Sequence, residues 1–356
     1  MTGTSSPLWT MTQSTPTALW NDSANPTELA QSIAWGAVGA TCNPVIAVAC
    51  IKADLPRWTE RIRAIAAERP RATEAQIGWQ VVQEISIEAA HLLRPAFERF
   101  GGRNGRVSVQ TDPRLHRDPV ALVDQAVHFS GLAPNVIVKI PATAVGIRAI
   151  EDAVARGVSI NVTVSFTVSQ AIAAAEAIER GMAARAAAGH DVTHMGHVVT
   201  LMVGRLDDWL KDAVARDGID IDPAALEWGG VAAFKRAYAV FQERGFRSRL
   251  LSAAFRNSLQ WSEFIGGDVV ISPPFGWQQR FQASGHDPQP RMDIAVEPAI
   301  LAALLTIADF RAAYDPEGLT PAQFDDFGAT RTTLRQFLGA DEELDQLVRD
   351  VLIPAP

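Results

Sequence analysis

The feature that most constrains the fold is a regular alternation of short apolar strands with helical segments. Eight runs rich in β-branched residues recur along the chain, and stretches of helical periodicity separate them. The expected strands are residues 18–20, 38–41, 107–110, 136–143, 159–164, 197–202, 249–253 and 268–272. Strands that alternate with helices in this way form parallel sheets, and eight of them close into a barrel. We therefore predict an α/β fold, a single (β/α)8 TIM barrel.

The rest of the chain flanks this barrel. Residues 1–17 are rich in Thr, Ser and Pro, which predicts a flexible leader. The barrel is expected over residues 18–296. Residues 297–356 carry no strand signal and predict a helical extension packed on the barrel, with helix starts at Pro298, Pro321 and Asp341. There is no internal repeat or linker of low complexity, so one domain is expected.

A lysine lies inside the most apolar of these strands. Lys139 is flanked by Val138 and Ile140, and burial disfavours the charged form of a lysine. A desolvated lysine therefore has a lowered pKa and presents a free amine that can attack a carbonyl carbon. Of the 32 Lys and Arg residues only four are lysines, and the pKa of arginine is too high for this chemistry. Lys139 is a candidate nucleophile; the alternative is a lysine whose head reaches solvent at the strand end.

Polar residues follow the apolar part of nearly every expected strand. In a parallel barrel these carboxyl ends meet on one face, which is where such barrels hold their binding sites. Each residue alone could be a helix cap or a turn residue, but together with a buried lysine they predict a pocket. The candidates are Asp22, Thr41, Asn43, Gln110, Lys139, Asn161, Thr163, Thr200, Arg205 and Arg256.

Composition and charge exclude several classes of function. The net charge is −8 and no basic block is present, so we expect no nucleic-acid partner and no binding to anionic membranes. The uncharged stretch 29–51 is long enough to span a bilayer, but polar residues and an Asn-Pro pair interrupt it. There is no basic segment for a signal peptide, and the two cysteines favour reduced thiols. A cytoplasmic protein without a metal cluster is expected.

The motifs at the ends of the expected strands resemble those of the transaldolase family. The signature of its fourth and fifth strands is similar to Val138-Lys139-Ile140-Pro141-Ala142-Thr143 and Asn161-Val162-Thr163. Its second-strand motif is similar to Gly39-Ala40-Thr41-Cys42-Asn43-Pro44. Its later motifs resemble Val203-Gly204-Arg205 and Ala254-Phe255-Arg256-Asn257. These motifs occur in the family's order between residues 20 and 272, whereas none explains the chain after residue 297.

The resemblance implies an α/β barrel with class I, Schiff-base chemistry that requires neither cofactor nor metal. Lys139 would form an imine with a ketose, and the adjacent carbon–carbon bond would then break. A transaldolase passes the resulting dihydroxyacetone unit to an aldose acceptor. The related fructose 6-phosphate aldolases release it as dihydroxyacetone. Sugars or sugar phosphates are the expected partners. The sequence does not fix the oligomeric state, and a homodimer is only what the resemblance implies, because members of the family often form dimers.

The resemblance also implies roles for the other candidates. Asp22 matches an aspartate that takes a hydroxyl proton during bond cleavage, and Thr163 matches a threonine that positions a water. The remaining matches are substrate-binding residues. Thr41, Asn43, Asn161 and Thr200 would contact the sugar, and Arg205 and Arg256 would hold its phosphate.

Three positions depart from the family's pattern. Gln110 stands where a typical transaldolase has a glutamate that helps to activate the water, and the related aldolases also have glutamine there. Ala254 replaces a serine that commonly binds phosphate. Met202 stands where transaldolases have phenylalanine and the aldolases have tyrosine, so it supplies no hydroxyl to protonate the enamine. Gln110 thus favours an aldolase, and Met202 disfavours one.

Three functions therefore remain open from the sequence. The leading prediction is a transaldolase-type transferase acting through Lys139. The second is an aldolase that releases dihydroxyacetone. The third is an inactive family member that binds sugar phosphates, although a binding protein has no need of the Lys139 amine.

Overall fold

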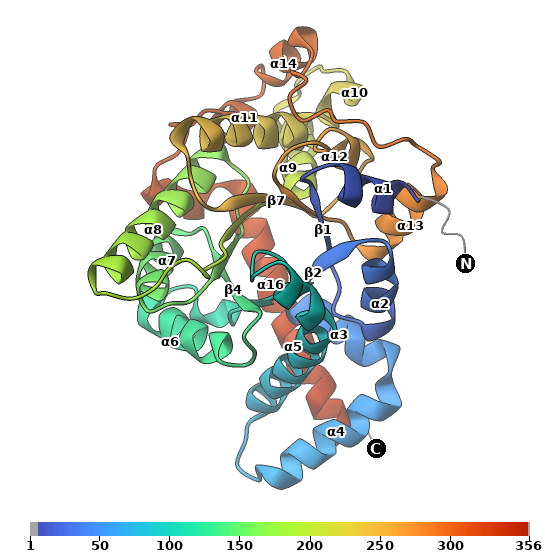
Figure 1. Cartoon of the computed structure of the whole chain (residues 1–356), viewed down its shortest axis with the longest axis vertical. Coiled ribbons are helices and arrows are strands. Elements are labelled where there is room, and N and C mark those ends of the chain that lie inside the picture. Colours follow the sequence, from blue (N-terminus) through green and yellow to red (C-terminus); the bar gives the residue numbers. More distant parts are fainter. Residues whose placement is uncertain (1–5, 355–356) are drawn as a thin grey trace.

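The computed structural model describes residues 6–354, and it confirms the predicted barrel. Eight parallel strands pair in chain order, and the last strand pairs with the first to close the sheet (Figure 1). The strands are β1 (Ala18–Asn21), β2 (Ala37–Cys42), β3 (Arg106–Gln110), β4 (Val136–Pro141), β5 (Ile160–Thr163), β6 (Val198–Leu201), β7 (Arg249–Ala253) and β8 (Val270–Ser272). Each lies within about two residues of its predicted position.

Helices cover the outside of the sheet. They are α2 (Pro26–Ala34), α3 (Pro44–Ala53), α4 (Leu55–Glu68), α5 (Glu74–Arg99), η1 (Pro113–Leu115), α6 (Pro119–Ser130), α7 (Ala144–Ala155), α8 (Val168–Ala187), α9 (Val203–Asp217), α10 (Pro223–Leu226), α11 (Gly229–Arg244), α12 (Leu259–Ser262) and α13 (Phe275–Ala283). Side-chain caps begin two of these helices: Asn25 accepts backbone N–H groups of α2, and Asp118 does the same for α6.

Side chains fill the barrel interior. An apolar cluster there consists of Ala18, Trp20, Ile137, Val198, Leu251, Ala253 and Val270. Successive residues of a strand point to opposite faces, so β3 places Ser108 and Gln110 on the same face of the sheet as Lys139 of β4. Gly39 is required beside the apolar cluster, because a Cβ there would lie 2.3 Å from the Trp20 indole.

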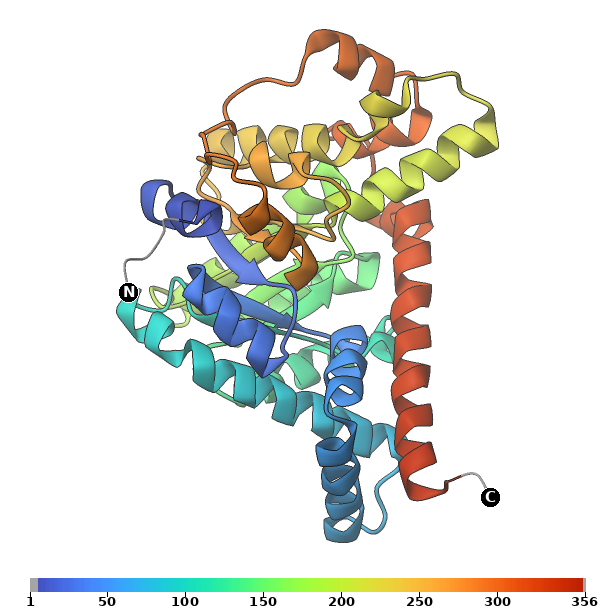
Figure 2. The ribbon, with the colours of Figure 1, turned by 90° about the vertical axis from the view of Figure 1, so that its right-hand side faces the viewer.

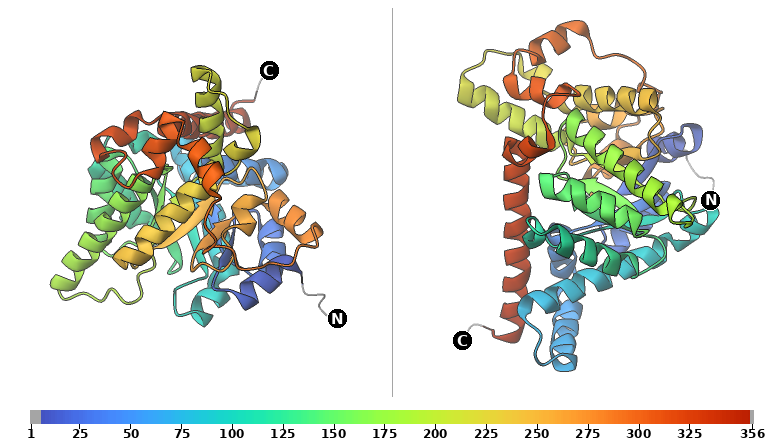
Figure 3. Two further views of the ribbon diagram at one scale, coloured as in Figure 1. Left: turned by 90° about the horizontal axis from the view of Figure 1, so that it is seen from above. Right: turned by 90° about the vertical axis from the view of Figure 1, so that its left-hand side faces the viewer.

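The C-terminal extension is helical, as predicted, and its last helix runs across one end of the barrel. It comprises α14 (Pro298–Leu304), α15 (Ala308–Tyr314), η2 (Pro321–Asp326) and α16 (Gly328–Leu352). Figure 2 and the right panel of Figure 3 show α16 as a long red helix beside the strand ends. Its partners include α3, α5, α9 and η1. This helix therefore covers the end of the barrel where the candidate residues gather.

Two sequence predictions are wrong in detail. Asp341 does not begin a helix but lies inside α16, where its buried carboxylate accepts the Trp79 indole N–H at 3.1 Å. The predicted loose leader is ordered from residue 6, because Pro7–Ser14 form helix α1. Leu8 and Met11 lie on one face of α1 and are fully buried. Residues 1–5 of the predicted leader lie outside the described residues.

Within residues 6–354, the chain has no helix that combines the length and the apolarity needed to cross a bilayer. The uncharged stretch 29–51 is divided among α2, β2 and α3. A helix–strand–helix arrangement therefore accounts for this segment.

Candidate active site

Lys139 points into the barrel from β4, as its strand neighbours establish. It pairs in register with Gln110 of β3 on one side and with Asn161 of β5 on the other. Asn161 donates from Nδ2 to Ser108 Oγ at 2.9 Å, a contact between two strands that β4 separates, so these side chains meet inside the barrel. Lys139 is 5% exposed. The three paired side chains therefore form one row at the carboxyl half of the interior.

The Lys139 ammonium has no hydrogen bond or ion pair among the residues that the structure describes. Burial lowers its pKa, Asp22 opposes that shift, and Arg205 adds to it. Asp22 follows β1 directly, and its pKa is raised by burial while Lys139 and Arg205 act to lower it. These three charges therefore lie close enough to influence one another. An amine of lowered pKa beside a carboxylate can act as a nucleophile with a neighbouring base.

A chain of hydrogen bonds orients Asn161. Thr200 donates from Oγ1 to Asn161 Oδ1 at 2.7 Å, and the Asn161 amide donates to Ser108 on the other side. Both ends of the Asn161 amide are thus fixed by buried partners. Thr41 is buried on β2, and Asn43 caps α3 by accepting the Ile46 N–H through Oδ1 at 2.9 Å. The structure therefore places Thr41 and Asn43 at the carboxyl end of β2, and Asn161 and Thr200 inside the barrel within β5 and β6.

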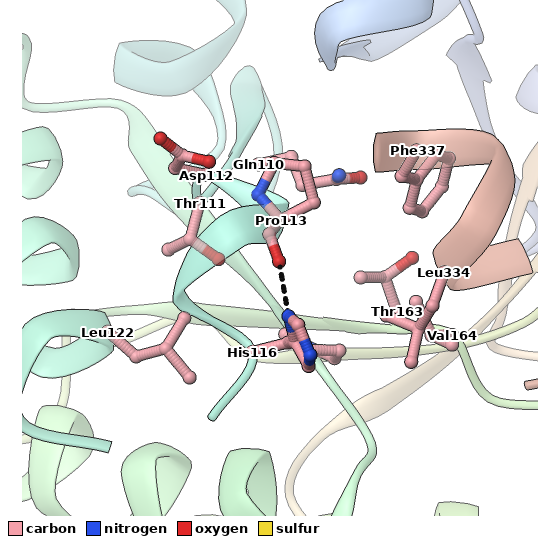
Figure 4. A pocket seen from close by; sticks show the side chains of 11 residues that line it. Gln110, Thr111, Asp112, Pro113, His116, Leu122, Thr163, Val164, Leu334 and Phe337 are labelled. Atoms are coloured by element: carbon pink, nitrogen blue, oxygen red, sulfur yellow. Dashed lines mark hydrogen bonds between the residues drawn. The ribbon is translucent and has the colours of Figure 1, made fainter. Parts of the chain in front are cut away.

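Gln110 and Thr163 line a small cavity beneath α16 (Figure 4). Its volume is about 10 Å³, close to the room that one water molecule needs. Gln110 Oε1 is buried and lacks a hydrogen-bond partner among the described residues. Leu334 and Phe337 of α16 close the cavity on one side. The predicted water-handling pair therefore faces a space of suitable size.

Backbone strain occurs at the carboxyl ends of β5 and β7. Val164 has φ of 50° and Ala254 has φ of 63°, which side chains other than glycine rarely adopt. Such strain concentrates at functional sites and persists only where surrounding contacts hold it. At Val164 the holding group is Gln170, whose Nε2 donates to the carbonyls of Val164 and Ala142 at 3.2 and 3.0 Å.

The two predicted phosphate ligands lie near each other but already have protein partners. Arg205 and Arg256 interact electrostatically, and burial lowers the pKa of Arg205. Arg205 donates to Thr333 Oγ1 at 3.2 Å and also to Gln336, both on α16. Arg256 forms an ion pair with Asp208 at 2.8 Å. The structure thus brings the pair together while α16 occupies part of the Arg205 fork.

Sequence reasoning missed three buried glutamines that hold the loops of this site. Gln170 restrains the loop after β5, as described above. Gln260 Oε1 accepts the backbone N–H of Arg256 at 2.5 Å, and Gln260 Nε2 donates to the Asp207 carboxylate at 2.5 Å. Gln278 donates to Asn21 Oδ1 at 2.7 Å, next to Asp22. Only Gln170 carried a sequence signal, because it forms a capping box with Thr167.

The sequence profile of a known family matches this chain over residues 19–315, and its description is Transaldolase/Fructose-6-phosphate aldolase. The chain belongs to the transaldolase/fructose-6-phosphate aldolase family. This match agrees with the closed barrel and with the motifs at its carboxyl end. It ends before α16 begins, so the helix that covers the site lies outside the matched region.

Curated relatives in this family carry the name transaldolase. Transaldolase 1 of Streptomyces avermitilis is 32% identical over 208 residues, which is 58% of this chain and 54% of the relative. The transaldolase of Thiobacillus denitrificans is 34% identical over 213 residues, 58% of each protein. That of Mycobacterium ulcerans is 35% identical over 179 residues, 50% of this chain and 48% of the relative. The chain thus matches about half the length of these curated relatives.

Metal ligands are not clustered in the described part of the chain. Within residues 6–354, no group of three or more His, Cys, Asp or Glu side chains is arranged to hold an ion. Cys42 and Cys50 are both free and buried, and burial raises the pKa of Cys42 to about 11. A reactive thiolate at Cys42 is therefore disfavoured.

Proposed function

We propose that this chain is a transaldolase-type enzyme that transfers a dihydroxyacetone unit from a ketose donor to an aldose acceptor through an imine on Lys139. The observation that carries the proposal is the state of Lys139. Its amine is buried, its pKa is lowered, no hydrogen bond holds it, and it lies near Asp22. A lysine with a purely structural role would be paired or would reach solvent.

In the first half of the reaction, Nζ of Lys139 attacks the ketone carbon of the donor. Loss of water from the adduct leaves a protonated imine. Asp22 takes the proton of the C4 hydroxyl while the C3–C4 bond breaks, and the bonding electrons move to the imine nitrogen. An aldehyde leaves, and an enamine of dihydroxyacetone stays bound to Lys139.

In the second half, the enamine carbon attacks the carbonyl of the acceptor aldose, and Asp22 returns its proton to the new hydroxyl. Water then hydrolyses the imine and frees the product. The cavity between Gln110 and Thr163 has room for that water. Gln110 can hold the water but cannot remove its proton, so the proton must go to another group of the site.

The donor's anionic group would bind at Arg205 and Arg256, which lie together beyond the strand ends. Since Thr333 and Gln336 accept hydrogen bonds from Arg205, a phosphate would replace the α16 contacts in the Arg205 fork. Helix α16 thus covers the site, and binding of a phosphorylated donor would move the Gln336 side chain away from Arg205.

The second candidate is an aldolase that releases dihydroxyacetone, and Gln110 favours it. Release requires a proton at the enamine carbon. Met202 offers a thioether rather than a hydroxyl, and its Sδ lies 3.9 Å from Thr163 Oγ1. The Thr163 hydroxyl is the one that contacts this thioether in the described structure, so slow release in the absence of an acceptor is expected rather than efficient turnover.

Borohydride trapping tests the proposal. The protein is incubated with fructose 6-phosphate, reduced with borohydride, and digested for peptide mass mapping. A dihydroxyacetone adduct on the Lys139 peptide, absent from the Lys139→Arg variant, would support both the imine and the bond cleavage. Arginine keeps the positive charge but offers no free amine, which makes it the matched control.

Turnover with and without an acceptor aldose then separates transferase from aldolase, because only an aldolase turns over alone. An adduct on another lysine would overturn the assignment of Lys139. Binding of the sugar phosphate without any adduct, also with unphosphorylated ketoses, would favour the inactive binding protein.

A further inference from the structure

A second polar cavity lies at the amino end of the barrel, opposite Lys139. Three segments line it: residues 101–103 with Arg106 at the start of β3, residues 193–198 at the start of β6, and Arg247 with Arg249 at the start of β7. Its volume is about 280 Å³. None of its lining residues belongs to the site described above. The cavity is therefore independent of the proposed transaldolase site.

The charges around this cavity do not balance. Four arginines line it, and two of them are neutralised by carboxylates outside the lining. Arg103 pairs with Asp268 at 2.5 Å, and Arg247 pairs with Glu179 at 2.6 Å. The other two, Arg106 and Arg249, have no ion pair among the described residues. No acidic residue belongs to the lining, and Asp268 acts on Arg249 as well as on Arg103, so four guanidinium charges face two carboxylates and two positive charges are left over.

Both uncompensated arginines are buried. Arg106 is 3% exposed and Arg249 is 9% exposed. Their hydrogen bonds go to neutral oxygens: Arg106 donates to the carbonyls of Gly102 and His194 at 2.7 and 2.9 Å. Arg249 donates through Nη2 to Arg103 O and to Asn104 Oδ1, both at 2.9 Å. A buried charge without a counterion is costly, and burial lowers the pKa of each arginine to about 10.

Donor groups are left over at this cavity. Nη1 of Arg106 and Nη1 of Arg249 have no hydrogen bond to any described residue. His197, also in the lining, accepts the Ile160 N–H through Nδ1 at 3.2 Å. The neutral ring must therefore carry its proton on Nε2. That buried Nε2–H lacks an acceptor in the described part of the chain.

We propose that this cavity is an anion site that takes a phosphoryl group, held by Arg106 and Arg249 with His197 Nε2–H as a third donor. A phosphate dianion carries the two negative charges that the arginines lack. Its oxygens accept from planar guanidinium forks. The cavity is larger than a phosphate ion, so the phosphoryl group can belong to inorganic phosphate or to a small phosphate monoester. Binding there stabilises the folded chain, because unfolding releases the ligand.

Calorimetry and thermal unfolding of the full chain test this site. Inorganic phosphate is titrated at constant ionic strength, with chloride as the reference salt. The titration is made on the wild type and on Arg256→Ala, which removes an anion ligand at the other end of the barrel. We expect phosphate to bind Arg256→Ala and raise its melting temperature, and to bind Arg249→Gln on the same background at least tenfold more weakly.

His197→Asn provides a milder variant if Arg249→Gln does not fold. Asparagine places Oδ1 where histidine has Nδ1, so the Ile160 N–H keeps its acceptor while the third donor is lost. On the Arg256→Ala background we expect phosphate affinity to fall several-fold. The matched control is His286→Asn, which lies at an exposed position outside the cavity lining and should leave phosphate binding unchanged.

Several results would overturn the proposal. One is that phosphate stabilises the protein no more than chloride does. Another is that Arg256→Ala abolishes all phosphate binding, which would place the anion at the carboxyl end alone. A third is unchanged affinity in Arg249→Gln or, if that variant does not fold, in His197→Asn. Glycerol 3-phosphate distinguishes the ligand source: tenfold tighter binding than inorganic phosphate would identify a monoester, and equal affinity the free ion.

Discussion

The two ends of the barrel bury positive charge in different ways. At the carboxyl end, Lys139 has a carboxylate in its neighbourhood, Asp22, and helix α16 lies over the opening. At the amino end, Arg106 and Arg249 have no acidic residue in their cavity. Strand β3 contributes to both, because Arg106 begins it and Gln110 ends it. The two cation sets thus differ in residue type and in counterion.

This difference teaches how residue type decides what a buried cation can do. Burial lowers the pKa of a lysine into a range where the free amine is accessible, so the amine can react. An arginine stays charged even when its pKa falls to about 10, as for Arg106. It can therefore only be hydrogen-bonded or paired with an anion. The carboxyl end is suited to covalent chemistry, and the amino end to anion binding.

Replacing Lys139 at the carboxyl end of the barrel should have the largest effect. Lys139→Ala should lower kcat for dihydroxyacetone transfer by about 10⁴-fold or more, because no other group can form the imine. Steady-state assays with a ketose donor and an aldose acceptor measure it. Lys52→Ala is the control, since the Lys52 side chain is 59% exposed. Turnover of Lys139→Ala near the wild-type rate would contradict the mechanism.

Replacing the nearby carboxylate should have the next largest effect. Asp22→Asn keeps the size of the side chain but removes the base, so kcat should fall by roughly 10²–10⁴-fold. The pKa of Asp22 is raised by burial, so in the wild type the acidic limb of the kcat–pH profile should lie above the usual range of aspartate. That limb should vanish in the variant. An unaltered profile would show that another group is the base, and Asp220→Asn at an exposed position serves as the reference.

At the amino end, protonation of His197 should make the stability of the protein depend on pH. Burial, followed by Arg106 and Arg247, lowers its pKa from 6.5 to about 3. The unfolded chain therefore binds more protons between pH 3 and 6.5, and stability rises with pH across that window. His197→Asn should remove roughly 4 kcal/mol of this dependence. Urea unfolding at several pH values measures it, and His194→Asn should keep the wild-type slope.

Titration of Asp341 on α16 should have the opposite sign. Burial, then Asp112, raises its pKa from 3.8 to about 7, while Arg114 opposes the shift. The native state binds more protons between pH 4 and 7, so this group makes stability fall as pH rises through that window. Asp341→Asn should remove roughly 3 kcal/mol of that fall, because the partly exposed Arg114 lets water screen the cluster.

The same unfolding series checks the Asp341 prediction. Asparagine still offers Oδ1 to the Trp79 indole, so the α16 contact is kept while the titration is lost. Asp350→Asn, at an exposed position of α16, is the matched control and should not change the slope. Equal slopes for the wild type and Asp341→Asn would mean that Asp341 is already ionised at pH 5.

The smallest expected effect concerns the anion group of the donor. Arg256→Ala should raise KM for a phosphorylated donor by roughly tenfold, as expected for the loss of one charge-assisted hydrogen bond, and should change KM for an unphosphorylated ketose far less. Comparison of fructose 6-phosphate with fructose measures the split. Equal effects on the two donors would place the phosphate elsewhere.

Much of the carboxyl-end site was predictable, because a parallel barrel holds its binding site where the carboxyl ends of its strands meet. Lys139 and Asn161 lie in short apolar strands, so their position at the strand ends predicts that they meet inside a barrel. Gln110 follows from the same rule on β3. By contrast, Arg106 and Arg249 begin their strands, where an isolated arginine is usually solvent-exposed. The sequence offered no sign that these two would be buried together.

In the helical extension, too, local sequence patterns predicted helix starts but not burial. Pro298 and Pro321 were correctly predicted as starts, because proline at the first helical position is a local preference. Asp341 was misjudged because an aspartate inside a helix looks like a cap until its burial is known. The cover that α16 provides over Arg205 depends on contacts more than 120 residues apart in sequence, 128 for Thr333.

By itself, the sequence determined the strand order, the barrel, and the presence of a lysine within the apolar strand β4. These follow from local periodicity and from the desolvation of one amine, both of which are properties of short segments. Only the tertiary structure decided which charges lack partners, which loops are strained, and which helix covers the site. Those outcomes depend on burial and on distances between segments that are far apart in the chain, and no local pattern encodes them.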